Sequence, residues 1–373
     1  MDSILFQLIS SSSAVTSFGS VAEEFLKLEF FSSYPRSRGN EIFKMVFNGK
    51  WRLLRFIILI TFLAVCCFTV YIPHLTAVPP KQVRGWELNV TRDVTRYVNP
   101  SNDTTIISGR EICEDPTFFV IIVTSAPANF IVRSAIRETW ASHNISNVKV
   151  GFLVGVTGNS SVQNAIEEES LEFKDIIQDN FVDSYNNLTL KSIVLLKWFV
   201  NHCPSPVYLM KADDDSYVNV KLLTPRLLQM SQRGLLAGVL ICKAKPISDA
   251  GNKWYSPKYM YHGAFYPNYL SGTGYIMSRD VVLKLYEASL STPIHYLEDV
   301  YITGICAEKA GVRPQNFHGF NYLNMGLKCT PDIITNHRVT PSDLRALWSL
   351  RDNCTEVKTT APPIKRKFSS GCH

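Results

Sequence analysis

The stretch YLMKADDDSYVN (residues 208–219) decides the fold. It joins an apolar run, typical of a buried strand, to the adjacent carboxylates Asp213, Asp214 and Asp215. Three neighbouring carboxylates repel one another unless a cation or water compensates, and the carboxyl end of a strand in an open α/β sheet is where ligands bind. Mn²⁺ and Mg²⁺ prefer oxygen ligands and bridge to diphosphates, so the stretch predicts a metal-dependent diphosphate site. The alternative is a solvated turn, or a cap for a helix beginning near Val218.

Strands and helices alternate on both sides of this stretch. Apolar runs predict buried strands at 117–124, 148–155 and 207–211, and apolar periodicity predicts helices over 131–142, 162–174 and 189–202. Such alternation is typical of an α/β fold with a mostly parallel sheet. The composition, 46% hydrophobic and 19% charged, supplies a sizeable core and excludes global disorder.

A second acidic pair, Glu298-Asp299, precedes a helix predicted over 300–310. One interpretation is a carboxylate that caps the helix, and the other is a general base that faces the metal site. The Gly-rich aromatic segment YPNYLSGTGY (266–275) lies upstream, where glycines permit close backbone approach and rings can stack on sugar faces. We therefore expect Tyr269, Trp254 and Glu298 to contact an acceptor sugar.

Basic side chains offer candidates for binding phosphate. Arg133 and Arg137 are four residues apart, on one face of the predicted helix, and guanidinium pairs fit phosphate oxygens. The alternative is a surface salt-bridge face that involves Glu138. Lys191 is a similar but weaker candidate.

Two histidines are candidates for a metal ligand. His337 follows an apolar run and could supply an imidazole, and His318 is its rival. A single histidine of this kind is also common in a purely structural role.

The run FIILITFLAVCCFTVYI (56–72) contains no charged residue. As a helix it would rise roughly 25 Å, near the lower limit for crossing a bilayer, and Leu53 and Leu54 can extend it. A buried core helix is the alternative. Basic residues cluster just before the run and place the N-terminus in the cytosol: Lys44, Lys50, Arg52 and Arg55. We therefore predict a single-pass signal anchor in an early-secretory or Golgi membrane, since a short span suits a thin membrane.

Cysteines and glycosylation motifs agree with a lumenal body. Seven cysteines follow the span without CxxC pairs, which favours disulfides over zinc and leaves at least one thiol free or intermolecular. Six Asn-x-Ser/Thr motifs follow the span and none precedes it. The net charge is +6, but Lys365-Arg366-Lys367 is the longest basic run, so we expect no nucleic-acid partner.

We predict five regions along the chain. They are a cytosolic tail (1–52), the transmembrane anchor (53–72), a lumenal stem (73–112), a catalytic domain (113–354) and a C-terminal tail (355–373).

Five collinear segments resemble the inverting β-1,3-glycosyltransferases, and most closely the Golgi β-1,3-galactosyltransferases. They are RSAIRETW (133–140), DIIQDNFVDSYNNLTLKS (175–192), YLMKADDDSYVN (208–219), YPNYLSGTGYIMS (266–278) and LEDVYITGICAEKAGV (297–312). The resemblance runs through roughly 113–350 and implies a GT-A type fold that binds a nucleotide sugar.

The resemblance also implies roles for individual residues. Asp215 would be the main metal ligand, with His337 as a second ligand, for Mn²⁺ or alternatively Mg²⁺. Asp299 would be the catalytic base. We expect the donor, UDP-galactose, to be contacted by Arg133, Arg137, Lys191, Asp213 and Asp214.

The implied activity is inverting transfer of galactose to the 3-hydroxyl of an acceptor sugar, such as an N-acetylglucosamine-terminated glycan on a glycoprotein or glycolipid. The product would be a β-1,3 linkage formed by a metal-assisted single displacement. Three alternatives stay open: a β-1,3-N-acetylglucosaminyltransferase of the same family, a metal-dependent phosphatase or nuclease, and a non-enzymatic lumenal lectin.

Overall fold

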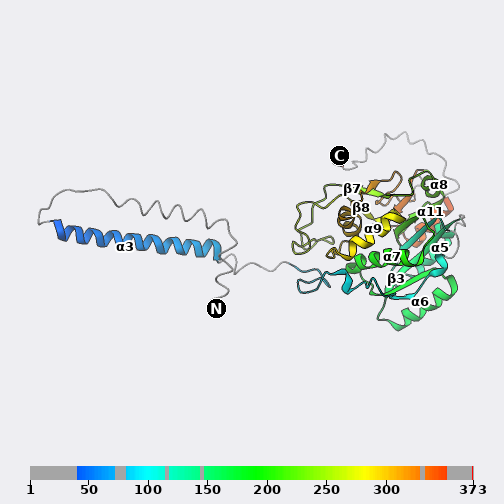
Figure 1. Cartoon of the computed structure of the whole chain (residues 1–373), viewed down its shortest axis with the longest axis horizontal. Helices are drawn as coiled ribbons and strands as arrows, with labels where there is room; N and C mark the ends of the chain where they lie inside the picture. Colours follow the sequence, from blue (N-terminus) through cyan, green and yellow to red (C-terminus); the bar gives the residue numbers. More distant parts are fainter. Residues whose placement is uncertain are drawn as a thin grey trace. The chain divides into compact units, whose positions relative to one another are not determined.

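A computed structural model describes residues 40–71, 81–113, 117–142, 147–327, 332–350 and Cys372. The chain divides into two units, one ending at Pro79 and one beginning at Pro80, and each is described by itself. The first contains helix α3 (Asn40–Cys66), which continues as the π-helical turn η1 (Cys67–Tyr71) (Figure 1). The segment Trp51–Thr69 of this unit has a mean hydropathy of 2.1. By length and composition it could cross a membrane. The predicted anchor is therefore a helix as far as Tyr71.

The second unit is built on a mixed sheet with strand order β1-β4-β3-β2-β5-β8-β7-β9. Strands β4, β3, β2 and β5 are parallel, whereas β8 is antiparallel to both β5 and β7. This arrangement confirms the predicted α/β fold with a mostly parallel central sheet. The bounds are β1 (Thr105–Ile107), β2 (Phe119–Thr124), β3 (Val148–Val156), β4 (Ile176–Val182), β5 (Tyr208–Asp213), β7 (Leu236–Ile241), β8 (Tyr269–Ser278) and β9 (Gln315–Asn316).

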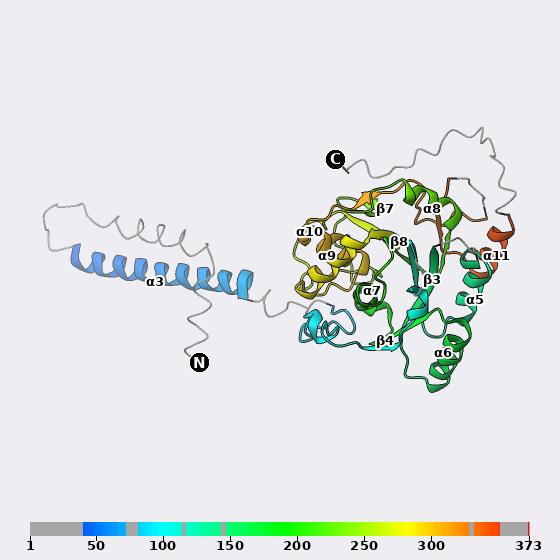
Figure 2. The same ribbon diagram turned by 45° about the vertical axis from the view of Figure 1, so that its right-hand side comes forward.

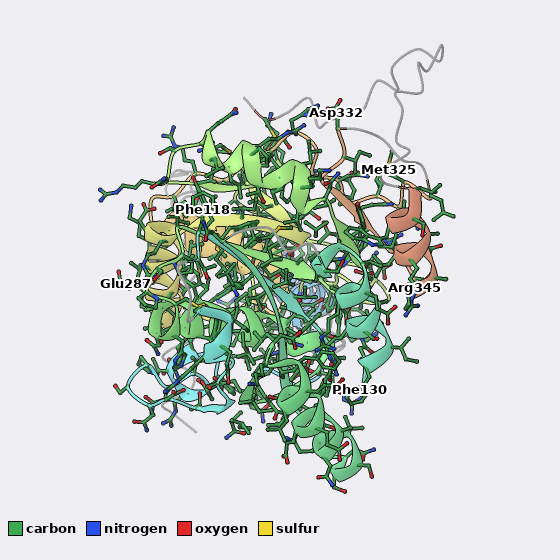
Figure 3. The ribbon with its side chains drawn as sticks, turned by 90° about the vertical axis from the view of Figure 1, so that its right-hand side faces the viewer. Phe118, Phe130, Glu287, Met325, Asp332 and Arg345 are labelled. Atoms are coloured by element: carbon green, nitrogen blue, oxygen red, sulfur yellow. A yellow bond between two sulfur atoms is a disulfide. The ribbon has the colours of Figure 1, made fainter. Side chains whose placement is uncertain are left out.

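Helices cover both faces of the sheet, because successive side chains of a strand point to opposite faces. Val120 and Ile122 of β2 belong to one core, with α7 (Leu188–His202) and α9 (Arg279–Leu290). Phe119 and Ile121 belong to the other core, and Figure 2 shows α7 and α9 on one side of the sheet and α5 and α11 on the other. The remaining helices are α5 (Phe130–Glu138), α6 (Ser160–Phe173), α8 (Val220–Leu228), α10 (Ala307–Lys309) and α11 (Pro341–Leu350).

Two helices differ from their predictions, one in its first residue and the other in its helix type. The helix expected near Val218 begins at Val220, because the Asn219 side chain accepts a hydrogen bond from the backbone N–H of Leu222 and caps it. The helix expected over 300–310 starts as a π-helical segment, η6 (Val300–Cys306), and only then becomes α10. Single π-helical segments are frequent at functional sites.

The structure differs from the stem that we expected over 73–112. From residue 81 onward the described part of this range packs into the second unit: the Trp86 side chain is buried and its Nε1 donates to the Asn186 carbonyl at 2.7 Å. Strand β1 pairs with β4, and Val94 joins the core that contains α7. Most of these contacts are made by single side chains outside long helices or strands. The sequence of this range therefore shows no apolar periodicity that would predict them.

Disulfides are confirmed. Cys113 is bonded to Cys203 at the end of α7, and Cys242 is bonded to Cys372. Among the described residues beyond the anchor, Cys306 is a buried free thiol. The predicted C-terminal tail lies outside the described residues except for Cys372.

We predict that Trp86→Ala lowers the free energy of unfolding of the second unit by about 3–5 kcal/mol, because it empties a buried site and removes a hydrogen bond. Leu88→Ala is the matched control, since Leu88 is exposed. This substitution should change the free energy of unfolding by less than about 0.5 kcal/mol. Denaturant unfolding of residues 80–373 measures both. Equal effects of the two substitutions would show that 81–112 is a stem after all.

Candidate active site

Three side chains that can hold a metal ion converge at the carboxyl end of β5. The ligand atoms of Asp213, Asp215 and His337 all lie within 4.8 Å of one another. Strand β6 (Ser216–Val218) follows the acidic triplet directly and pairs with β10 (Thr335–His337), which places His337 opposite Ser216. Two strands distant in sequence therefore bring the imidazole to the carboxylates.

The His337 ring is oriented by a second contact. Its Nδ1 lies 3.2 Å from the Tyr322 carbonyl oxygen, which can only accept, so a proton on Nδ1 would be donated to that oxygen. Its Nε2 faces Asp215 Oδ1 at 3.2 Å. Backbone contacts of this kind commonly fix the tautomer of a metal-binding histidine. Two carboxylates and an imidazole nitrogen together fit a divalent cation.

Asp215 is held in its charged form. Burial acts to raise the pKa of Asp215, but the hydrogen bond and the charge of His337 outweigh burial and hold that pKa below its usual value. A carboxylate that is ionised at neutral pH is ready to bind a cation.

Asp214, the middle carboxylate, has protein partners instead. Its Oδ2 accepts hydrogen bonds from Ser125 Oγ and Asn129 Nδ2, both at 2.8 Å. Burial raises the pKa of Asp214. Lys191 is buried beside this group and donates to the Ser125 carbonyl at 2.6 Å and to Asp183 at 2.7 Å. Donor binding by Asp214 and Lys191 stays a prediction.

The structure does not bring Arg133 and Arg137 to the metal-binding cluster. The Arg133 guanidinium is fully buried and its Nη2 lies 2.6 Å from Glu169, while Arg137 pairs with both Glu169 and Asp175. This favours the ion-pair alternative to phosphate binding, although with partners other than Glu138. The sequence conceals these partners, because Glu169 comes from α6 and Asp175 directly precedes β4, more than 30 residues away.

Lys211 is a site residue that the sequence analysis missed. Its Nζ, buried in β5, lies 2.5 Å from Asp213 Oδ1, 2.6 Å from the Gly272 carbonyl oxygen and 3.7 Å from Glu298 Oε2. Burial acts to lower the pKa of Lys211, but the charges of Asp213 and Glu298 raise it above its ordinary value. The sequence does contain a signal for this residue, which is a lysine inside an otherwise apolar strand. A charge buried in such a strand is usually paired with an opposite charge.

Glu298 lies beneath the site rather than at an acceptor. The side chain is buried, and its Oε1 accepts hydrogen bonds from Tyr275 OH at 2.6 Å and Ser192 Oγ at 2.7 Å. The expected acceptor contact is therefore replaced by bonds to β8 and α7. Glu298 fixes the position of the residue that follows it.

Asp299 is half-buried, and the structure shows its capping contact, while its role as a general base stays a prediction. Its Oδ1 accepts from the backbone N–H of Val300 at 2.9 Å and so caps η6, while its Oδ2 accepts from the Gly272 N–H at 3.3 Å. Burial and the charge of Glu298 raise the pKa of Asp299 to about 6. A carboxylate with such a pKa suits a general base near neutral pH.

Gly272 allows this approach of β8 to Asp299. A Cβ at position 272 would lie 3.3 Å from the Cβ of Asp299. The neighbouring side chain would have to move, so a side chain here would displace the candidate base.

Aromatic side chains lie close to Asp299. Tyr269 is half-buried, and burial and the charge of Asp299 raise its pKa. Trp254 is 49% exposed, and its side chain is hydrogen-bonded to Tyr185. Burial, then the charge of Asp299, raises the pKa of Tyr185 to about 12. Tyr185 was not singled out from the sequence, although it lies in one of the segments that carry the resemblance.

Comparison with known proteins decides the family. A family model described as galactosyltransferase matches residues 132–318. Beta-1,3-galactosyltransferase 1 of Mus musculus is 37% identical over 264 residues, which are 68% of this chain and 80% of that protein. The chain belongs to the galactosyltransferase family. Beta-1,3-galactosyltransferase 5 of Mus musculus is 35% identical over 65% of this chain and 82% of its own length.

Among solved structures, the bifunctional glycosyltransferase WbbM in its apo form is similar, with a TM-score of 0.38 and 12% identity over 64% of this chain and 51% of that chain.

Membership of the galactosyltransferase family confirms the predicted enzyme class, a hexosyltransferase. The range matched by the family model includes the acidic triplet and Asp299, whereas His337 lies beyond its end.

We predict that Asp215→Asn and His337→Ala each weaken Mn²⁺ binding by more than about 100-fold, since loss of even an outer-shell partner commonly costs 10–100-fold. Asp332→Asn is the control, because Asp332 is an exposed carboxylate outside the cluster and pairs with Arg226. Titration calorimetry with Mn²⁺ measures all three. Wild-type affinity in Asp215→Asn would refute the proposed ligand set.

Proposed function

We propose that this galactosyltransferase transfers galactose from UDP-galactose to the 3-hydroxyl of an acceptor sugar and forms a β-1,3 linkage with inversion. Two relatives that carry the name beta-1,3-galactosyltransferase, at 35–37% identity, support the donor and the linkage. One structural observation carries the chemistry. A half-buried carboxylate with a raised pKa, Asp299, and a metal-binding cluster are joined by one buried lysine, Lys211.

Asp213, Asp215 and His337 would hold the metal, with Mn²⁺ as the proposed ion and Mg²⁺ as an alternative. A bound divalent cation would neutralise the charge that develops on the departing diphosphate. The chain's own part is to fix the ligands in place: the Tyr322 carbonyl orients His337, and Lys211 holds Asp213.

Asp299 would accept the proton of the acceptor's 3-hydroxyl as that oxygen attacks the anomeric carbon. The new bond joins the acceptor oxygen to that carbon, the bond from the carbon to the diphosphate breaks, and UDP departs. The proton passes from Asp299 to solvent afterwards. The reaction is a single displacement, so it needs no covalent enzyme intermediate.

The acceptor would lie against Tyr269, which is half-buried, and Trp254, which is exposed, because aromatic rings can stack on a sugar ring. We propose an acceptor that ends in N-acetylglucosamine, on a glycoprotein or a glycolipid.

We further propose that the protein is a type II protein of the Golgi membrane, with the second unit in the lumen. The basic residues before the apolar window of α3 favour a cytosolic N-terminus. The bonds Cys113–Cys203 and Cys242–Cys372 are of a kind that persists in an oxidising compartment.

We predict that Asp299→Asn lowers turnover of UDP-galactose with an N-acetylglucosamine acceptor by ~10²–10⁴-fold, while Mn²⁺ affinity stays unchanged. The base works only when deprotonated, so wild-type turnover should fall as pH drops below about 6, the raised pKa of Asp299. A cation bound nearby would favour the charged carboxylate and move this limb to lower pH. Steady-state release of UDP, measured against pH, tests both.

Glu298→Gln is the informative comparison for this experiment. The charge of Glu298 raises the pKa of Asp299, so its removal should shift the acid limb to lower pH without abolishing turnover. Melting temperatures of both variants separate a catalytic loss from a folding loss. The assignment fails if Asp299→Asn turns over normally, or if a folded Glu298→Gln is the inactive variant. Faster turnover with UDP-N-acetylglucosamine than with UDP-galactose would refute the donor.

A further inference from the structure

The connection between β7 and β8 is strongly basic. Residues 243–268, called the basic loop below, contain four lysines against one aspartate, a net charge of +3. All four lysines are exposed, and none forms an ion pair or a hydrogen bond through its ammonium group within the part of the chain that the structure describes. They are Lys243, Lys245, Lys253 and Lys258.

The basic loop is fixed next to the candidate base. At its end, the Tyr266 N–H donates to the Ala244 carbonyl at 2.9 Å. In its middle, the Tyr255 carbonyl accepts a hydrogen bond from Tyr296 OH at 2.5 Å, and Tyr296 is only three residues before Asp299. These bonds join the two ends of the basic loop to each other and its middle to the segment that leads to Asp299.

Two of the lysines lie beside exposed aromatic rings. Lys253 Nζ is 4.3 Å from the ring centre of Tyr185, which neighbours Trp254, and Lys245 Nζ is 5.4 Å from the ring centre of Phe265. Phe265 is 47% exposed and Tyr185 is 43% exposed. Each ammonium lies over its ring in a cation–π contact, which leaves its N–H donors free to bind an anionic substituent of a sugar.

The negative charge of the site bears on what these exposed lysines could bind. Asp213, Glu298 and Asp299 surround a single ammonium, that of Lys211, so negative charge remains in excess among these four groups and cations nearby would favour an anionic acceptor. A neutral acceptor needs no such cations. The unpaired lysines also contribute no ion pair to the stability of the described fold.

We propose that the acceptor is acidic, with a carboxylate or a sulfate ester on one of its two terminal sugars, and that Lys245 and Lys253 bind this group. The proposal rests on the proposed galactosyl transfer, of which it specifies the substrate class.

The test uses the full-length protein in detergent with Mn²⁺ and UDP-galactose. Three disaccharide acceptors are compared, each ending in N-acetylglucosamine: one on glucose, one on glucuronic acid, and one on glucose with a 6-sulfate on the N-acetylglucosamine. We expect kcat/KM for at least one acidic acceptor to exceed that for the neutral acceptor by about tenfold or more, as one charge-assisted contact allows. The preference should decrease with added salt.

Variants then identify the groups responsible. In the double variant Lys245→Met, Lys253→Met the ratio of acidic to neutral kcat/KM should fall to about 1, while Lys253→Arg should keep it. Lys221→Met, at an exposed lysine of α8, is the control and should behave as wild type.

Each outcome decides the proposal. If the wild type uses the neutral acceptor at least as well as both acidic ones, the acceptor is not acidic, although galactosyl transfer stands. If it uses none of the three, both proposals fall. If the double variant keeps the ratio but loses binding to vesicles of phosphatidylcholine with phosphatidylserine, the lysines contact a membrane and the proposal is wrong.

Discussion

The buried ammonium of Lys211 is the interaction on which the rest of the site depends. It lies among the carboxylates of Asp213, Glu298 and Asp299, which come from β5 and from the start of η6. Without a cation between them these charges would repel one another in a poorly solvated place, and an unpaired buried charge is costly. Its further bond to the Gly272 carbonyl ties β8 to β5 at the level of the base.

One cluster thus gives two carboxylates opposite properties. Asp215 faces His337, whose hydrogen bond and charge outweigh burial and keep the pKa of that carboxyl low, as a metal ligand requires. Asp299 is half-buried next to Glu298, and burial and the charge of Glu298 raise the pKa of Asp299 towards the range of a base. Two acids whose environments move their pKa values apart commonly take different roles in one reaction.

The sequence predicts the fold well, because the parallel strands are continuous apolar runs and the helices keep a regular period. It also locates the acidic triplet and Asp299, since position at a strand end and at a helix start is a local property. Partners that arise from distant segments are not visible: Arg133 meets Glu169 of α6, and Glu298 meets Ser192 of α7. The packing of 81–112 depends on single side chains such as Trp86 and was mistaken for a stem.

The same contacts argue for a single displacement. Among the described carboxylates of the site, Asp214 is bonded to Ser125 and Asn129, and Glu298 is bonded to Tyr275 and Ser192. Asp215 faces His337, and Asp213 is bonded to Lys211. The proposed single displacement assigns the base to Asp299 and requires none of these other described carboxylates to act as a nucleophile.

The anomeric configuration of the first-formed product, followed by proton NMR with UDP-galactose as donor, tests this claim most directly. The arrangement predicts a β-galactoside from the start of the reaction. An α-galactoside would contradict it, because a single in-line attack on an α-linked donor cannot retain the configuration.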